Sequence, residues 1–85
     1  MTTAEARQAL LDYLTPLGWV PARDVFSWAR STLRVSPHQV RGDVRALIQE
    51  GRVERQFWSA DRCAAYSGVY KNGQGTWCDL RAVQP

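Results

Sequence analysis

The sequence is poor in the features that would place it in several large classes of protein. No apolar run approaches the roughly 20 residues that a membrane span needs, and residues 1–14 lack the basic-then-apolar layout of a secretory signal. Internal repeats, low-complexity stretches and linkers are also missing. These absences favour a single small domain, residues 1–85, in the cytoplasm and with no membrane partner.

Metal-binding and catalytic side chains are equally scarce. Cys63, Cys78 and His38 are the whole supply of cysteine and histidine, whereas a structural zinc site usually takes four such ligands. We expect both cysteines to be reduced thiols, because disulfides are rare in the cytoplasm, although the sequence leaves open whether they ever pair. No carboxylate pair, nucleophile–base set or phosphate-binding loop is evident. The expectation is therefore no metal, no cofactor and no enzymatic activity.

Positive charge comes almost entirely from arginine. Ten of the eleven cations are arginines and Lys71 is the only lysine, which against eight acids gives a net charge of +3 at pH 7. Arginine forms planar bidentate contacts with phosphate and guanine, so a nucleic-acid surface would use it, although a GC-rich genome would also produce the excess. Residues 1–20 contain one cation and two anions, and residues 21–50 contain five and three. The positive excess thus begins after the first predicted helix.

Hydrophobic periodicity predicts three helices, at about residues 2–15, 22–32 and 36–50. Thr2 and Glu5 fit a capping box at the start of the first helix. Ser36 as N-cap, Pro37 in the first turn and Gln39 at the capping-box position mark the start of the third helix. The third helix also has an apolar stripe that should face the core, formed by Val40, Val44, Leu47 and Ile48.

After Gly51 the apolar period changes to that of a β-strand. Residues 53–58 alternate, residues 66–71 read as a second strand, and residues 76–83 read as the returning strand after a turn at Asn72-Gly73. A short extended piece precedes the second helix. The predicted fold class is therefore α+β: three helices followed by a two- or three-stranded antiparallel β wing at about residues 52–83.

Two helices joined by a short turn and followed by a β-hairpin have the layout of a winged helix-turn-helix. Residues 35–55 also contain a Val-Ser helix start, Val-Arg at the helix centre, an apolar pair one turn on, then Glu-Gly, an apolar residue and an arginine. This stretch resembles the recognition helix and first wing strand of GntR-type and DeoR-type bacterial regulators.

The chain departs from those families in three respects. One extra residue precedes Leu33, and Arg34 replaces the glycine of the turn, so we expect a longer or reshaped turn between the second and third helices. The wing is longer than usual. The sequence also ends at Pro85 with no evident sensor domain, where those regulators continue into an effector-binding domain.

The resemblance implies that the third helix enters the major groove of duplex DNA. Helical geometry places its outer face opposite the apolar stripe, with Arg41 and Asp43 on the flanks; this face comprises His38, Gln39, Gly42, Arg45, Ala46 and Gln49. Arg45 suits guanine, Gln39 or Gln49 suits adenine, and Gly42 would allow close approach to bases. A solvated polar face with a chance glycine is the alternative.

The full set of candidate DNA contacts adds the helix start, the arginines around the second helix and the wing tip. It consists of Ser36, His38, Gln39, Arg41, Gly42, Arg45, Gln49, Arg23, Arg30, Arg34, Lys71 and Asn72. For Arg41 we expect a phosphate contact or a brace to the wing. The wing-tip residues also fit a plain hairpin turn.

We therefore expect a small, sequence-specific, double-stranded DNA-binding protein, either a transcriptional regulator or an accessory factor of a phage or mobile element. The rival is a winged-helix protein-interaction module, such as a small phage-encoded inhibitor of a larger host complex. The low net charge and the four tryptophans favour the rival, since exposed aromatics would suit a protein partner or a homodimer. We expect Trp19 and Trp77 in the core, and Trp28 and Trp58 only partly buried.

Overall fold

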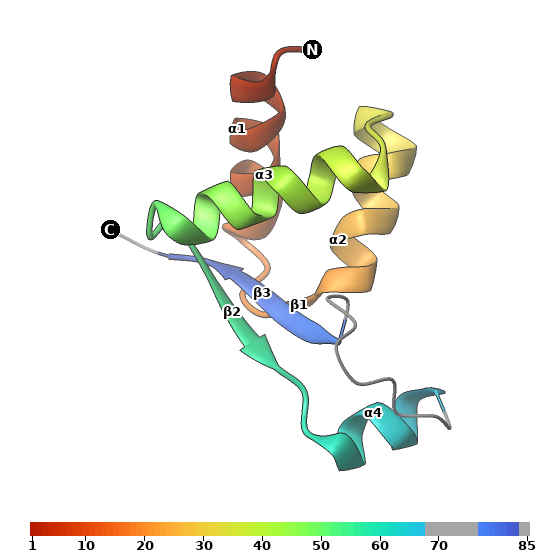
Figure 1. Ribbon diagram of the computed structural model, residues 1–85. Coiled ribbons are helices and arrows are strands. Elements are labelled where there is room, and N and C mark those ends of the chain that lie inside the picture. The colour runs from red at the N-terminus through yellow and green to blue at the C-terminus, as the bar shows by residue number, and fades with distance from the viewer. Residues whose placement is uncertain (68–76, 84–85) are drawn as a thin grey trace.

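The computed structural model describes residues 1–67 and 77–83, which form an α+β structure of helices packed against a three-stranded antiparallel sheet (Figure 1). The elements follow in the order α1 (Thr3–Leu14), β1 (Val20–Pro21), α2 (Ala22–Trp28), η1 (Ala29–Leu33), α3 (Pro37–Gln49), β2 (Val53–Phe57), α4 (Ala60–Ser67) and β3 (Cys78–Ala82). The strands lie in the order β1-β3-β2. The α+β class, the three main helices and the short extended piece are confirmed.

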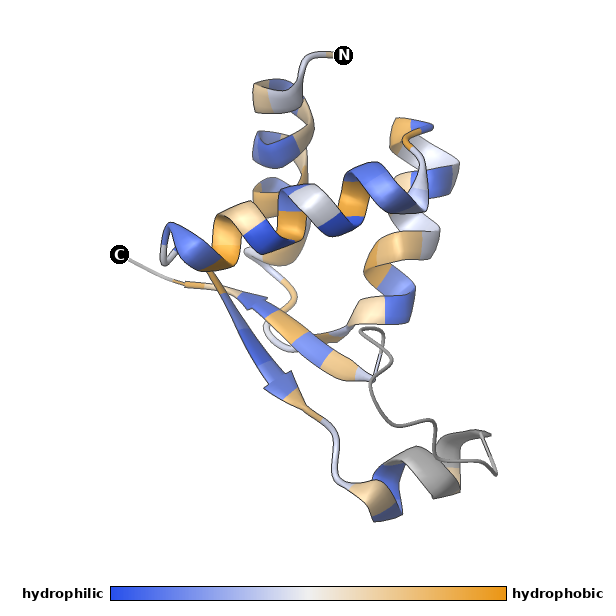
Figure 2. Cartoon of the chain, viewed as in Figure 1, coloured by the Kyte–Doolittle hydropathy of each residue, from blue (hydrophilic) through white to orange (hydrophobic). Residues whose placement is uncertain are grey.

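The core lies where α1, α2 and α3 meet the sheet. Its largest fully buried apolar side chains come from all three helices and from β3, and they are Leu10, Leu14, Val25, Val40, Leu47 and Leu80. Figure 2 shows the apolar stripes of the helices interrupted by polar positions. No helix in the described part of the chain is long and apolar enough to cross a membrane.

The predicted helix starts are confirmed, with one correction. Thr2 accepts from the Glu5 backbone N–H at 3.1 Å and its own N–H donates to Glu5 Oε1 at 2.9 Å, which completes the capping box of α1. Ser36 Oγ likewise accepts from the Gln39 N–H at 3.1 Å, with Pro37 in the first turn of α3. The Gln39 side chain does not close a capping box, because it donates to Asp43 instead.

The extra residue between the second and third helices is accommodated inside the second helix. After Trp28, α2 continues as the π-helix η1, whose wider turn holds one more residue than an α-turn. Arg34 then adopts the left-handed conformation, with φ 56° and ψ 36°. This is the turn position at which the sequence was expected to have glycine from its resemblance to GntR-type and DeoR-type regulators. The backbone thus reaches the start of α3 at Ser36, as predicted.

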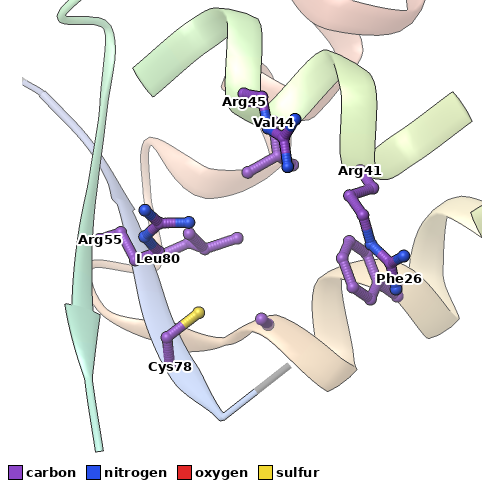
Figure 3. Close-up of a pocket in the computed structure, with 8 residues that line it drawn as sticks. Phe26, Arg41, Val44, Arg45, Arg55, Cys78 and Leu80 are labelled. Carbon is purple, nitrogen blue, oxygen red and sulfur yellow. The ribbon is translucent and has the colours of Figure 1, made fainter. Parts of the chain in front are cut away.

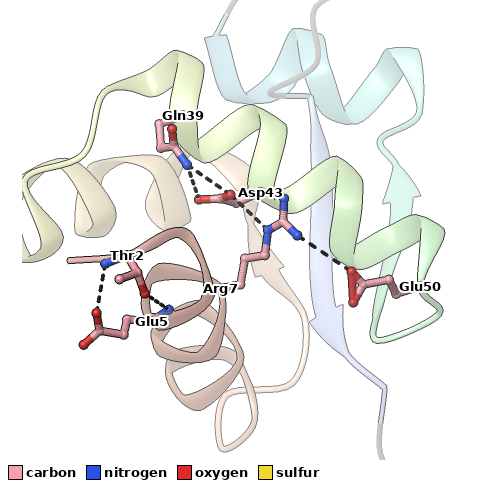
Figure 4. A network of polar contacts seen from close by, with 6 residues as sticks. All are labelled: Thr2, Glu5, Arg7, Gln39, Asp43 and Glu50. Carbon is pink, nitrogen blue, oxygen red and sulfur yellow. Dashed lines mark hydrogen bonds and ion pairs between the residues drawn. The ribbon is translucent and has the colours of Figure 1, made fainter.

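A buried carboxylate joins α1 to α3 (Figure 4). Asp43, only 2% exposed, accepts from Arg7 Nε at 3.1 Å and from Gln39 Nε2 at 3.1 and 3.2 Å. Arg7 also lies 3.9 Å from a carboxylate oxygen of Glu50. The sequence pattern placed Asp43 on a flank of α3, whereas the structure buries it against α1. The ion pair and the amide satisfy the charge that burial would otherwise penalise.

The wing differs most from its prediction. β2 pairs directly with β3, with Val53 opposite Ala82 and Phe57 opposite Cys78. The predicted strand at residues 66–71 is wrong at its start, because α4 continues to Ser67; the rest of that strand and the Asn72-Gly73 turn lie outside the described residues. Ser59 Oγ accepts from the Arg62 N–H at 3.1 Å, a helix-start signal that the β pattern concealed.

The expected roles of two tryptophans are reversed. Trp58 is 7% exposed and Trp19 is 39% exposed, whereas we expected Trp19 in the core. Trp58 Nε1 donates to Asp79 Oδ1 at 2.8 Å, and the Arg62 guanidinium lies 4.1 Å from the Trp58 ring centre while it donates to the same carboxylate. Trp28 is partly buried, as expected, whereas Trp77 is also only partly buried and the expectation that it lies in the core is wrong. This cluster anchors the first turn of α4 to β3.

The contacts of Asp43 predict a loss of stability on its substitution, and the exposed Glu54–Arg81 ion pair provides a control. Asp43→Asn replaces one acceptor with an amide that faces two donors, so we expect a loss of about 1–3 kcal/mol in the free energy of unfolding. Glu54→Gln is the matched change in the exposed Glu54–Arg81 pair, and it should cost less than about 1 kcal/mol. Urea denaturation measures both. Equal losses in the two variants would contradict the structural role of Asp43.

Asp79 predicts an acid dependence of stability. Burial raises the pKa of its carboxyl, but hydrogen bonds from Arg62 and Trp58 outweigh burial and hold the pKa below its ordinary value. Its stabilising contribution is therefore present above about pH 4 and is lost as pH falls through the lower folded-state pKa. Asp79→Asn should unfold more readily than the wild type at pH 7, and the difference should shrink toward pH 2. A constant difference in urea midpoints across that range would contradict it.

Candidate nucleic-acid interface

One side of α3 is not used by the fold. Its buried side consists of Val40, Asp43, Val44 and Leu47. The opposite side is exposed, and it presents His38, Arg41, Gly42, Arg45 and Gln49. The four side chains of this set make no hydrogen bond or ion pair with any residue in the described ranges. These five residues are called the α3 outer face below.

The outer face loses Gln39 and Ala46 from its prediction and gains Arg41, and the nearby candidate Ser36 has a structural role. Gln39 is exposed, but its amide is bound to Asp43, so it is committed to the α1 side of the helix. Ala46 is half-buried. Ser36 is exposed and its hydroxyl caps the helix. Arg41, which the sequence placed on a flank, is exposed beside Arg45 and belongs to the face.

Gly42 lies at the centre of the outer face, and no crowding by the residues that the structure describes accounts for it. A Cβ built on Gly42 meets no atom within 4 Å. A glycine inside a helix costs about 1 kcal/mol relative to alanine, because its backbone loses more freedom on folding. The fold therefore gives up stability at this position without a packing benefit. A molecule that approaches the α3 backbone closely would supply the missing reason.

The three candidate arginines in and after the second helix lie at its two opposite ends. Arg30 in η1 and Arg34 after it are exposed and lie in the segment that leads into the start of α3. Arg23 is exposed in the first turn of α2, which follows β1 at the other end of that helix. Arg30 and Arg34 therefore accompany the start of α3, and Arg23 does not. Lys71 and Asn72 lie outside the described residues.

Sequence reasoning missed Arg55 as a member of the site. Its sequence neighbour Glu54 does not neutralise it, because Glu54 pairs with Arg81 across the strands. The Arg55 guanidinium lies 4.6 Å from the centre of the Phe57 ring and borders a pocket that Arg41 and Arg45 also border (Figure 3). The signal was available, because Arg55 occupies a position of β2 that alternation assigns to the helix-covered face of the sheet.

No group of three or more His, Cys, Asp or Glu side chains that could hold a metal ion occurs among the residues described. Cys78 is buried on β3, and burial raises the pKa of its thiol. The side chain of Cys63 lies outside the described part, so its pairing with Cys78 stays untested. Comparison of the chain with protein-family models, curated proteins and solved structures finds no match in any of the three.

Gly42, inside α3, and Gly51, just after its C-terminal end, give opposite predictions for substitution by alanine. Gly42→Ala should raise the free energy of unfolding by about 1 kcal/mol, since the added methyl group meets open space and the backbone gains helix propensity. Gly51→Ala should lower it by about 1 kcal/mol, because Gly51 has φ +75° and alanine is strained there. Chemical denaturation measures both. A destabilised Gly42→Ala variant would mean that the helix is crowded at that point.

Proposed function

We propose that the protein is a winged helix-turn-helix that binds double-stranded DNA sequence-specifically, with α3 in the major groove. The arrangement of the chain supports this: α2 and α3 are joined by a short turn, and β2 and β3 follow as an antiparallel pair. The resemblance of residues 35–55 to GntR-type and DeoR-type regulators supports it independently. The insertion of α4 between β2 and β3 is a departure from the expected wing.

The observation that carries the proposal is the α3 outer face. It combines two arginines, a histidine and a glutamine around a glycine, and all five residues lie on one side of a single helix. An α-helix fits the major groove, and a small residue at the centre of its outer face lets its backbone approach the base edges. Within the described ranges these side chains make no hydrogen bond or ion pair, so the polar groups of this face remain available to a partner.

Each member of the face has a chemical role in this proposal. Arg45 forms a bidentate contact with guanine O6 and N7, and Gln49 suits adenine N6 and N7. His38, in the first turn, donates to a phosphate or to a base edge. Arg30 and Arg34 contact phosphates beside the groove, which orients the helix without reading sequence.

The decisive variant is Arg45→Ala, tested on a duplex first selected from random sequence. We expect a loss of about 1–3 kcal/mol on the selected duplex and a smaller loss on a scrambled one, because a base contact is removed. Arg30→Ala should weaken both duplexes alike and reduce the salt slope by about one. Fluorescence anisotropy at several salt concentrations measures these affinities.

Arg52→Ala is the matched control for lost charge. Arg52 is exposed and lies in a shallow groove with Gln8 and Asp12 of α1, away from the outer face. Its replacement should leave both affinities unchanged within about twofold. If Arg45→Ala is as neutral as Arg52→Ala, the proposed reading face is wrong. Circular dichroism establishes that each variant is folded.

A protein-binding module is the second candidate, and one observation favours it. Leu17, Trp19 and Val83 are 52%, 39% and 39% exposed, and Arg81 lies 4.4 Å from the Trp19 ring centre. Exposed apolar and aromatic side chains beside an arginine are typical of protein interfaces. If the wild type binds no duplex at low salt, the DNA-binding proposal fails and protein binding through this surface takes its place.

A further inference from the structure

A pocket lies between α3 and the sheet, and three arginines border it (Figure 3). Arg41 and Arg45 reach it from α3, and Arg55 reaches it from β2. The volume is about 80 Å³. Its other walls are largely apolar, with Phe26 from α2, Val44 from α3 and Leu80 from β3. The pocket thus has a cationic rim and an apolar floor.

The three guanidinium groups have no counter-charge in the described structure. Its ion pairs involve Arg7, Arg62 and Arg81, and none of the residues described along the pocket wall is acidic. Three like charges around one small space repel each other. A bound anion would relieve that repulsion and accept charge-assisted hydrogen bonds from guanidinium groups.

Arg55 is an exposed cation on the face of the sheet that meets α3. It is the cross-strand partner of Leu80, and directly opposite residues of an antiparallel pair share a face of the sheet. Leu80 is 1% exposed on that face. The Arg55 guanidinium also lies 4.6 Å from the centre of the Phe57 ring, a cation–π contact that restricts its side chain. Its charge also acts on the Cys78 thiol at the pocket, opposing the increase in pKa that burial causes.

We propose that this pocket binds a small organic anion, with a carboxylate or phosphate at Arg41, Arg45 and Arg55 and a short apolar group against the floor. An inorganic anion or a backbone phosphate alone would leave the partly exposed Phe26 side chain of the lining in contact with water. An apolar group would remove that surface from water, which is favourable. An apolar cavity of about 150 Å³ holds benzene, so this pocket admits part of a ring or a short chain.

Ligand binding has a consequence that rests on the proposed function. Arg41 and Arg45 belong both to the pocket and to the α3 outer face. An anion that engages their guanidinium groups would withdraw them from DNA, so ligand and duplex would each lower the affinity for the other. The pocket would then give this domain a ligand response of its own.

The test uses phenyl phosphate as the probe, with inorganic phosphate and phenol as controls at constant ionic strength. We expect phenyl phosphate to bind with a dissociation constant of about 1–10 mM, inorganic phosphate to bind at least tenfold more weakly, and phenol not to bind. Amide chemical shifts in two-dimensional NMR spectra should change in α3, β2 and β3. Equal affinity for the two phosphates, shifts confined to other elements, or no saturable binding would each overturn the proposal.

Arg55→Met and Arg52→Met are the matched variants. Both remove an exposed arginine and keep an unbranched side chain, but only Arg55 borders the pocket. We expect Arg55→Met to weaken phenyl phosphate binding at least tenfold and Arg52→Met to leave it within twofold. Similar losses in both would overturn the assignment, because they would indicate attraction by net charge alone.

A separate arm adds the selected duplex. Phenyl phosphate should weaken duplex binding more than inorganic phosphate does at equal ionic strength. If the wild type binds no duplex, the proposed function fails while the NMR measurement still decides whether the pocket binds the anion. If the duplex binds and phenyl phosphate does not, only the pocket inference fails.

Discussion

The buried carboxylate of Asp43 fixes the rotation of α3 about its own axis. Arg7 reaches it from α1 and Gln39 reaches it from one turn earlier in α3, and the carboxylate is 2% exposed. Rotation of α3 in either direction would move this buried charge away from Arg7 of α1, at a cost that apolar packing alone would not impose. Because the helix is held in this way, the positions opposite Asp43 and Val40 must face outward. The outer face is a consequence of that orientation.

The same orientation separates charge across α3. The flank that faces α1 contains Asp43 and Glu50, and Arg7 forms an ion pair with each of them. The flank that faces the sheet contains Arg41 and Arg45, with Arg55 on the strand opposite. The net charge of +3 therefore underestimates how positive this flank is, because none of the described residues that line its pocket is acidic. Local asymmetry, more than total charge, supports an anionic partner.

Local signals predicted the helices well, because their starts and core stripes lie within a few residues of sequence. The capping box at Thr2 and the N-cap at Ser36 are examples. The wing and the site were less predictable, because they depend on contacts between distant residues. Trp58 is buried because Asp79, 21 positions later, accepts its indole N–H. Gln39 was assigned to base reading because its partner Asp43 was not recognised as buried. The place of Arg55 beside Arg41 and Arg45 depends on the pairing of β2 with β3, which sets Leu80 opposite Arg55.

The position of β3 has a consequence for folding during synthesis. β3 is the last of the three strands in the sequence, yet it lies between β1 and β2 and bonds to both. The first two strands have no backbone partner until Cys78–Ala82 leaves the ribosome, so only helix packing can precede that moment. The exposed edges of β1 and β2 would be open to pairing with other chains in that interval. Both strands have features that limit this hazard: β1 has two residues and contains Pro21, and β2 has a charged residue at Glu54 and at Arg55.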